Sequence, residues 1–507
     1  MKRVILSFSA CFLFGLLCLW PLLSAGLHTD DWGWLALAHM LDNPLASYTK
    51  NILWGYFYRP SAMVFWWMTE RLAGDQSAWH YLINVALHSA SASCLALLLR
   101  AAGRPVWLSA GVGLLYVCCP AIAGTSLWLS SRNEMLALFA GLCSMLFLEH
   151  EIRKQRFHGF AISVFLFIAL TAKESAYLFP FACACRVFFD FELRRSLKRR
   201  KAVLIIFYLF VPLVLSASLR SITIIPIGPE ANAASLFETL RVGITHWFRV
   251  WPSAISGFDA GRIYWIYFSV ISATALLALS TIYANGKTRA WGLAALLLVF
   301  APGALQAPIT ATVLSQASAI DFPENLRFYA TSSLGVLLLI GMCMPVTSFK
   351  WYSGIALSSL LLVGGLTSFN LAAAWRDNTQ TDDRQARRLA VLIPALMTKT
   401  PCQGLNRIMI KADVMPSIAP WIDPALKAQW PRAANIQHCS FFVESQQSYY
   451  QILPLIDCDK TNWSADTYRQ FSSKASLMPL DSVCQTSMLP PNETNANAII
   501  ELPFLGH

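Results

Sequence analysis

Two adjacent acidic residues follow the first apolar segment of the chain, and they are well suited to acid–base chemistry. That segment ends near Leu27, and Asp30 and Asp31 come almost directly after it. A carboxylate there can take a proton from a hydroxyl group while the hydroxyl oxygen attacks an electrophile. Asp is also common at helix N-termini, so capping of the next helix is the structural alternative. We favour the chemical role, because cationic residues occupy similar places later in the chain.

Four further turns between apolar segments carry charged or aromatic polar groups. They are Tyr58-Arg59-Pro60, Ser131-Arg132-Asn133-Glu134, Ala172-Lys173-Glu174-Ser175 and Glu324-Asn325-Leu326-Arg327-Phe328-Tyr329. Arg and Lys can hold a phosphate group whose negative charge grows as it leaves. Taken singly, each turn has a plain alternative: an exposed ion pair contributes little, and an Arg can extend to the lipid headgroups. Together with the acid pair, five turns at one membrane face indicate a shared site.

A stripe of polar residues marks the second apolar segment. His80, Asn84 and His88 are spaced four residues apart, so they share one face of a helix. Polar side chains inside a membrane span normally face protein or a cavity, and for His88 both interhelical hydrogen bonding and ligand contact fit the pattern. Two His eight residues apart lack the ligand spacing of a zinc site, so no structural metal is expected.

The composition places these residues in a membrane. Of the 507 residues, 56% are hydrophobic and 13% are charged, whereas soluble domains carry about 25% charged residues. An ordinary cytosolic enzyme and a disordered protein are therefore excluded. The net charge of +11 resides before Arg376, because the tail from there on carries 12 basic and 12 acidic residues. The chain has no basic stripe interleaved with aromatic residues, so nucleic acid is not an expected partner.

Eleven apolar segments predict an all-α polytopic membrane protein with about 11 transmembrane helices. They lie near residues 4–27, 79–99, 106–127, 133–149, 158–172, 175–191, 202–219, 263–284, 290–310, 329–346 and 352–373. Every second loop is short and basic, which predicts a cytoplasmic N-terminus. An odd number of spans then puts the C-terminal tail on the opposite face. The Met-Lys-Arg start fits a bacterial inner (cytoplasmic) membrane protein, so we expect the tail to be periplasmic.

The chain divides into a membrane part, residues 1–375, and a soluble extracytoplasmic tail, residues 376–507. Two long loops, 28–78 and 220–262, lie on the same side as the tail and contain half-apolar stretches that suit interfacial helices. We expect the tail to form a small mixed α/β domain. Its four cysteines predict two disulfides with three alternative pairings. These cysteines are Cys402, Cys439, Cys458 and Cys484.

The ordered set of motifs resembles the GT-C glycosyltransferases. The resemblance is carried by the acid pair, Tyr58-Arg59-Pro60, Asn84 to His88, Ser131 to Glu134, Lys173-Glu174 and Arg327-Phe328-Tyr329. The set is most similar to the protein O-mannosyltransferase-like branch, including the membrane part of the TMTC proteins, and it covers about residues 1–375. The chain departs from that branch in its Asp-Asp pair, in the separation of Glu324 from Arg327, and in a tail without tetratricopeptide repeats.

The resemblance implies an inverting enzyme that moves a sugar from a polyprenyl-phosphate-linked donor to a periplasmic or cell-surface acceptor, which would be a glycan, a lipid or a protein. It implies that Asp30 is the general base and Asp31 its neighbour, and either could orient the acceptor hydroxyl. The residues implied to contact the donor phosphate or sugar are Arg59, Arg132, Lys173, Glu174, Arg327, Tyr58, Tyr329, Asn84 and His88. GT-C families differ in their use of metal, so a divalent metal at the acid pair stays open.

Two other functions fit a polytopic chain. An oligosaccharide polymerase or ligase would use the same kind of donor but move a whole glycan. A transporter or lipid flippase should show repeat symmetry, broken helices and charges near the bilayer midplane. In this sequence the charges cluster at one predicted face and no repeat is evident, which favours an enzyme. A receptor or scaffold that acts through the tail would leave the five polar turns unexplained.

Overall fold

The structure is a computed structural model of the chain. It describes residues 2–50, 58–154, 158–196, 199–223, 251–252, 254–256, 264–284, 286–305, 326, 328–344, 350–396, 406–411, 439–445, 448–450 and 498–501. The chain splits into two compact units. Unit 1 contains Met1–Leu23, Tyr81–Ser218 and Ala231–Trp375, and unit 2 contains Ser24–His80, Leu219–Glu230 and Arg376–His507. Each unit is described by itself.

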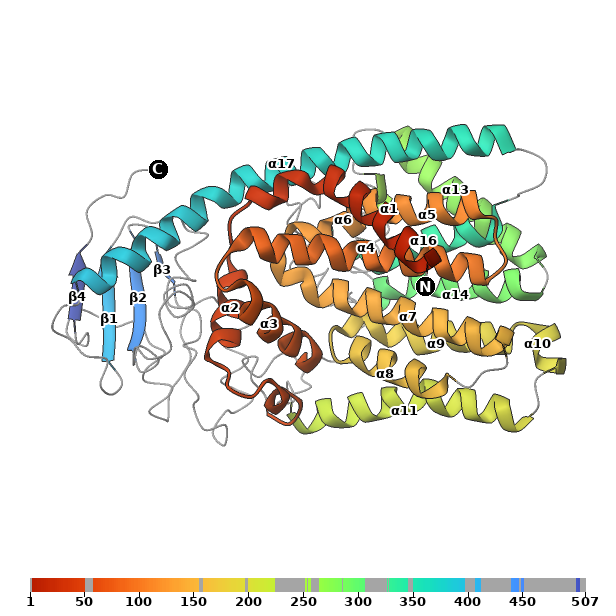
Figure 1. The fold of residues 1–507 in the computed structure, drawn as a ribbon, viewed down its shortest axis with the longest axis horizontal. Coiled ribbons are helices and arrows are strands. Elements are labelled where there is room, and N and C mark those ends of the chain that lie inside the picture. The colour runs from red at the N-terminus through yellow and green to blue at the C-terminus, as the bar shows by residue number, and fades with distance from the viewer. Residues whose placement is uncertain are drawn as a thin grey trace, which may run out of the picture. The chain divides into compact units, whose positions relative to one another are not determined.

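Unit 1 is built from helices. Its elements, four of which extend beyond the bounds of the unit, are α1 (Lys2–Leu19), η1 (Trp20–Ser24), α4 (Ser77–Ala101), α5 (Val106–Cys118), α6 (Pro120–Leu127), η3 (Leu129–Ser131), α7 (Arg132–Lys154), α8 (Gly159–Leu170), η4 (Glu174–Tyr177), α9 (Leu178–Phe188), α10 (Phe191–Ser196), α11 (Arg199–Thr223), α13 (Tyr264–Tyr283), α14 (Gly286–Leu305), α16 (Ala330–Cys343) and α17 (Lys350–Leu396). The helices α7, α8 and α9 lie side by side (Figure 1), and α14 packs against both α9 and α16.

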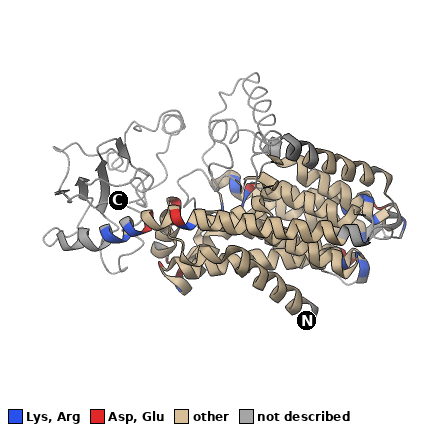
Figure 2. Cartoon of the chain, turned by 90° about the horizontal axis from the view of Figure 1, so that it is seen from above, with Lys and Arg blue, Asp and Glu red and all other residues tan. Residues whose placement is uncertain are grey.

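Several of these helices are apolar enough to cross a bilayer. Among the described residues, five helices pass a test of length and hydropathy, and the pair α5–α6, bent by 50°, would make a sixth. Figure 2 shows Lys, Arg, Asp and Glu mainly at helix ends. The chain is therefore a helical membrane protein with several spans. All eleven predicted segments contain a helix, but α8 and α16 have 12 and 14 residues, fewer than the ~20 that a span needs. The count of eleven stays a prediction.

Glycines let the helices of unit 1 approach closely. A Cβ atom at Gly335 of α16 would lie 2.7 Å from the backbone nitrogen of Val299 in α14, and one at Gly141 of α7 would lie 2.5 Å from the ring of Phe179 in α9. Small residues at helix contacts are a general means of packing helices in membranes, where no hydrophobic force draws them together. These contacts fix the positions of the helices that carry the polar turns.

A buried ionic cluster, centred on Glu149, joins three helices near the end of α7. The Glu149 carboxylate accepts hydrogen bonds from Arg186 Nε at 2.9 Å and from Trp291 Nε1 at 3.1 Å. Arg186 also donates to Asp190 at 2.5 Å. Each of these four side chains is buried. Glu149 Oε1 makes no hydrogen bond among the described residues, and Lys287 Nζ lies 3.9 Å from it. Because an unpaired buried charge is costly, the Arg186 cation ties α7 to α9, and Trp291 adds a bond from α14.

Unit 2 contains two helices that follow the first span in sequence. They are α2 (Asp30–Met40) and α3 (Pro60–Ala73), with the short turn η2 (Pro44–Tyr48) between them. The helices pack against each other, and the rings of Trp34 and Trp66 stack with centroids 6.0 Å apart. Pro60 begins α3, where its missing N–H costs nothing. The helices predicted within the first long loop are thereby confirmed; whether they lie in the membrane interface stays a prediction.

The described part of the tail contains one mixed sheet. Its strands are β1 (Asn406–Lys411), β2 (Cys439–Ser445), β3 (Ser448–Tyr450) and β4 (Ala498–Glu501), in the order β3-β2-β1-β4. The central strand β1 is parallel to β2 and β4, and β3 is antiparallel to β2. Cys439 begins β2, opposite Asn406. The other three tail cysteines lie outside the described residues, so the disulfides remain a prediction.

Candidate functional site

The structure gives the two adjacent acids different surroundings at the start of α2. Asp31 is fully buried (0% exposed), and its Oδ2 accepts a hydrogen bond from the backbone nitrogen of His28 at 3.1 Å. This bond holds the backbone before the helix and is not an N-cap bond, because Thr29 is the N-cap residue of α2 and makes no side-chain capping hydrogen bond. Asp30 is half-buried, and its Oδ1 accepts from the Thr29 hydroxyl at 3.2 Å. Asp30 is therefore the more accessible carboxylate of the pair.

The residue before the acid pair has a strained backbone. Thr29 has φ 44° and ψ −121°, and it is the one non-glycine residue with positive φ in the described chain. A β-branched residue is rarely found with positive φ, and such strain costs roughly 1–3 kcal/mol and clusters at functional sites. The conformation persists only where neighbouring contacts hold it, so those contacts indicate what positions the acid turn, defined here as residues 28–31.

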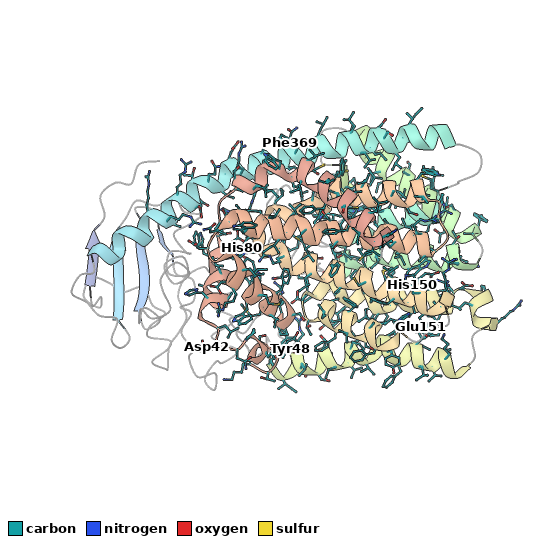
Figure 3. The ribbon with its side chains drawn as sticks, viewed as in Figure 1. Asp42, Tyr48, His80, His150, Glu151 and Phe369 are labelled. Carbon is teal, nitrogen blue, oxygen red and sulfur yellow. The ribbon has the colours of Figure 1, made fainter. Side chains whose placement is uncertain are left out.

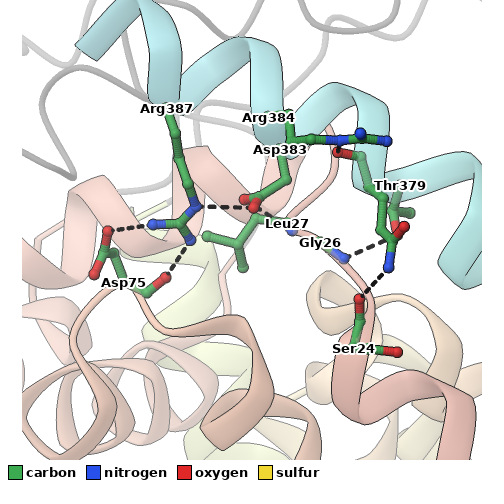
Figure 4. A network of polar contacts seen from close by, with 9 residues as sticks. Ser24, Gly26, Leu27, Asp75, Thr379, Asp383, Arg384 and Arg387 are labelled. Carbon is green, nitrogen blue, oxygen red and sulfur yellow. Dashed lines mark hydrogen bonds and ion pairs between the residues drawn. The ribbon is translucent and has the colours of Figure 1, made fainter. Parts of the chain in front are cut away.

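The end of α17 supplies part of that hold. We call residues 376–388 the α17 extension; like the acid turn, it belongs to unit 2. Gln380 Nε2 donates to the carbonyl of Ser24 at 2.9 Å, the backbone nitrogen of Gly26 donates to Thr379 Oγ1 at 3.1 Å, and that of Leu27 donates to Asp383 Oδ1 at 3.3 Å (Figure 4). Three side chains from a short stretch of one helix thus bind the segment that leads into the acid turn.

A histidine–aspartate pair adds a further contact between the acid turn and the α17 extension. His28 Nδ1 lies 2.6 Å from Asp382 Oδ2. One residue therefore binds the α17 extension through its side chain and Asp31 through its backbone nitrogen. Arg387 adds a bridge, donating to Asp383 at 2.8 Å and to the Asp75 carboxylate at 2.7 Å (Figure 4).

Tyr58 and Arg59, two further predicted site residues, also belong to unit 2. Both residues are buried next to the N-terminus of α3. The Tyr58 hydroxyl donates to the carbonyl of Tyr48 at 3.2 Å, and the Tyr48 hydroxyl (Figure 3) lies 2.7 Å from that of Ser61. Tyr58 therefore braces η2 against α3, while Arg59 contributes a buried positive charge to this unit.

In unit 1 the structure brings together residues from several of the predicted turns. Arg132, at the first position of α7 and only 1% exposed, donates from Nε to Asn84 Oδ1 of α4 at 2.8 Å. The amide nitrogen of Asn84 is buried and has no hydrogen-bond partner among the described residues. Buried polar atoms are nearly always bonded. This amide can therefore donate to a ligand, with a buried guanidinium close by.

Glu134 joins two more turns to the same end of α7. Its Oε1 accepts from the hydroxyl of Ser175 in η4 at 2.7 Å and from that of Thr331 in α16 at 3.0 Å. The nearby Ser131 Oγ and Asn133 Oδ1 are buried and have no partner within the described segments. The N-terminal ends of α7 and α16 and the turn η4 thus form one polar cluster, which we call the Glu134 cluster.

The remaining predicted donor residues have varied surroundings. Lys173 Nζ and Glu174 Oε2 are 3.9 Å apart, and both side chains are partly exposed. Tyr329, the residue directly before α16, is fully buried. Arg327 lies outside the described residues.

The two histidines of the polar stripe make structural contacts. His88 is buried, and its Nε2 lies 3.0 Å from the carbonyl of Val117, so it donates from α4 to α5. His80 (Figure 3) in the same way bonds the carbonyl of Gly74 at 2.8 Å and packs against Trp66. The Nε2 bond of His88 is the interhelical contact that the sequence allows, while its Nδ1 is buried without a partner among the described residues.

No group of three or more His, Cys, Asp or Glu side chains in the described segments could hold a metal ion. The question of a divalent metal is therefore open as before.

The sequence does not predict two sets of contacts around the candidate site residues. Thr331 was not singled out, because nothing in the sequence ties it to Glu134, 197 residues away. The α17 extension was assigned only to the tail. One available signal was the polar run from Arg376 to Arg388, which begins directly after the last apolar segment.

Comparisons with known proteins add little to this geometry. No protein-family model matches the chain, and no curated protein sequence does. Among solved structures, the chain is similar to the archaeal oligosaccharyltransferase AglB from Archaeoglobus fulgidus, which was solved with an inhibitory peptide and a dolichol-phosphate. The identity is 11% and the TM-score 0.47, and the match covers 85% of this chain and 65% of that one. At these values the likeness carries no argument about activity.

Proposed function

We propose that the protein is an inverting glycosyltransferase of the GT-C type that uses a polyprenyl-phosphate-linked sugar, in the O-mannosyltransferase-like and TMTC-like branch of that superfamily. The observation that carries the proposal is the division of the acid pair. Asp31 accepts a backbone hydrogen bond, whereas Asp30 is the more accessible carboxylate and follows a residue with a strained backbone. One carboxylate held at the end of a membrane span is what a single general base requires.

In this reaction Asp30 removes the proton of an acceptor hydroxyl. The hydroxyl oxygen attacks the anomeric carbon of the donor sugar from the face opposite the phosphate. The bond between that carbon and the phosphate oxygen breaks, and polyprenyl phosphate leaves with the electron pair. The products are the glycosylated acceptor with inverted configuration and free polyprenyl phosphate, and the proton passes from Asp30 to solvent.

Residues of unit 1 are assigned to the donor. Arg132 binds the phosphate, since guanidinium groups form strong charge-assisted hydrogen bonds with phosphate oxygens. The unpaired amide of Asn84 donates to the donor. Glu134, held by two hydroxyl groups, keeps one carboxylate oxygen for a sugar hydroxyl. Lys173, with a partly exposed ammonium group, is a second phosphate ligand.

Other residues keep the roles that the resemblance implies, as part of the same proposal. Arg59 and Arg327 are further phosphate ligands, and Glu174, Tyr58 and Tyr329 support the sugar site. His88 bonds Val117 through Nε2, and its buried Nδ1, which has no partner among the described residues, is assigned with Asn84 to the lining of the donor site. The acceptor is a periplasmic or cell-surface glycan, lipid or protein. The protein would lie in the bacterial inner membrane with its N-terminus in the cytoplasm and its tail in the periplasm.

The test is a donor panel with the purified full-length protein in nanodiscs. Each polyprenyl-phosphate sugar is incubated with it, and release of polyprenyl phosphate is followed by mass spectrometry. We expect one donor to be consumed, slowly by water alone and faster with the acceptor, and NMR to show an inverted anomeric centre. Release of a lipid carrying a whole glycan would instead favour a ligase. If every donor is left intact and radiolabelled donor lipid moves between the two leaflets, the protein is a transporter and not a glycosyltransferase.

A further inference from the structure

The hydrogen-bond requirements of the His28–Asp382 pair define its geometry. The Asp382 side chain is 2% exposed and that of His28 is 19% exposed. A carboxylate in its ionised form only accepts hydrogen bonds, and in that form the 2.6 Å contact has His28 Nδ1 as its donor. A carboxylate that fixes the ring of a histidine in this way sets both its tautomer and its orientation. Asp382 therefore determines how His28 is held.

His28 passes this constraint to the acid turn. Its backbone nitrogen donates to Asp31 Oδ2, and Thr29, which has positive φ, separates it from Asp30. A shift of His28 would release the backbone bond to Asp31 and allow Thr29 to relax toward negative φ. Either change would rotate the Asp30 carboxylate away from its present position.

The charges that face His28 come from two elements. On α2 they are Asp30 and Asp31, and on the α17 extension they are Asp382 and Asp383, with Arg387 binding Asp383. Asp382 contacts the imidazole ring, whereas Asp383 accepts from the backbone nitrogen of Leu27. Asp382 can thus be changed while the other bonds of the α17 extension remain.

We propose that Asp382 is a positioning residue for the general base, acting through the ring of His28. This inference rests on the proposed function, because it assigns Asp382 a role in the step that Asp30 performs. Asp382 touches neither the donor nor the acceptor in this account. Its loss should lower kcat and leave the KM for the donor unchanged, because the donor contacts were assigned to other elements.

The variants are Asp382→Ala, Asp382→Asn and the control Asp377→Ala. Asp377 lies on the same helix with a side chain 63% exposed and is paired only with its neighbour Arg376 in the described contacts. Rates are divided by the number of donor-binding sites, so that loss of folded protein does not register. We expect kcat to fall roughly 10- to 100-fold in Asp382→Ala, as for loss of other supporting residues. Asp382→Asn keeps an acceptor oxygen, so its kcat should fall less. The kcat of Asp377→Ala should match that of wild type.

Hydrogen–deuterium exchange of the peptide around residues 26–33 provides a readout that needs no turnover. We expect faster exchange in Asp382→Ala than in wild type or Asp377→Ala. Unchanged exchange would show that Asp382 does not hold the turn and would overturn the inference. Faster exchange with an unchanged kcat would also overturn it, because the turn would be held without consequence for the base. A wild-type protein that turns over no donor would instead refute the proposed function, while exchange would still decide whether Asp382 holds the turn.

Discussion

The helix α7 carries a buried glutamate near each end, and the two have opposite surroundings. Glu149 is bonded by Arg186 and Trp291, so its charge is neutralised within the protein. Glu134, about 22 Å away along the helix at 1.5 Å per residue, is bonded by the neutral hydroxyls of Ser175 and Thr331. Ser131 Oγ and Asn133 Oδ1, close to Glu134 in sequence, are buried without a hydrogen-bond partner among the described residues, and so is Glu149 Oε1. The clusters differ in charge: Glu149 has a cation at hydrogen-bond distance, whereas Glu134 makes no ion pair within the described residues.

This difference separates stability from function. A buried ion pair contributes mainly to holding helices in place, and its rupture is costly. A buried carboxylate that can still accept hydrogen bonds, close to polar atoms without partners, lowers the stability of the fold. Such a group is retained where it binds a ligand. We therefore expect changes at the Glu149 cluster to affect unfolding and changes at the Glu134 cluster to affect turnover.

The largest effect should come from Arg186→Met. It removes the cation that bonds the buried carboxylates of Glu149 and Asp190, leaving Glu149 with the more distant Lys287 at 3.9 Å, and this should destabilise the protein by about 3–5 kcal/mol. Thermal unfolding in detergent measures this, and Arg384→Met, which removes an exposed Arg, is the matched control. The turnover of the Arg186→Met protein that remains folded should equal that of wild type. A Tm equal to that of the control would remove the contrast between the two clusters.

Glu134→Gln should show the reverse pattern. The Gln carbonyl can still accept from Ser175 and Thr331, so stability should change by less than about 1 kcal/mol. Turnover should fall by roughly 10- to 100-fold, because a hydrogen bond from a sugar hydroxyl to a charged acceptor contributes about 1.5–3 kcal/mol. Steady-state rates and Tm are measured on one preparation. Full activity with a lowered Tm would place Glu134 in the same structural class as Glu149.

Gly26→Ala extends the comparison to the acid turn. A Cβ there would lie 2.4 Å from Cβ of Asp383 and 2.6 Å from the Thr379 carbonyl oxygen. The segment must move off the α17 extension, at a cost of about 1–3 kcal/mol, and turnover should fall with it. Gly354→Ala is the control, since a Cβ at Gly354 meets no atom within 4 Å. If Gly26→Ala matches this control in Tm and rate, the close contact does not position the turn.

The smallest effect on stability should come from Lys173→Ala. Its ammonium lies 3.9 Å from Glu174 and both side chains are partly exposed, so the pair should contribute less than about 1 kcal/mol. The KM for the donor should rise nonetheless, if the ammonium binds phosphate. Donor titration of the variant measures this. An unchanged KM would make the pair a surface contact and restrict the phosphate site to arginines.

Sequence reasoning located the elements better than the contacts between them. The half-apolar stretches after the first span predicted α2 and α3, because burial of one aromatic face has a clear pattern. The turn from Ser131 to Glu134 was recognisable, since charges beside apolar segments need an explanation. The partners of these residues were not predictable. The pairing of His28 with Asp382 joins positions 354 residues apart, and only the packing of the chain brings them together.

The pattern of residue types also does not predict the local geometry of the acid turn. The sequence could not divide the acid pair, because Asp30 and Asp31 have the same chemistry and adjacent positions. The difference arises from the backbone bond of His28 to Asp31 and from the positive φ of Thr29. For His88, the sequence leaves two alternatives open; its Nε2 bonds Val117 in the neighbouring helix, and its Nδ1 has no partner in the described part of the chain.

The central claim is that Asp30, and not Asp31, is the general base. The most direct test compares Asp30→Asn, Asp31→Asn and Asp42→Asn, an exposed control just after α2, with the donor that wild type consumes. We predict that Asp30→Asn binds this donor with wild-type affinity but turns it over at least about 100-fold more slowly, since loss of a general base costs 10²–10⁴-fold. Asp31→Asn should lose stability and retain more of the rate. Wild-type turnover by Asp30→Asn would contradict the account.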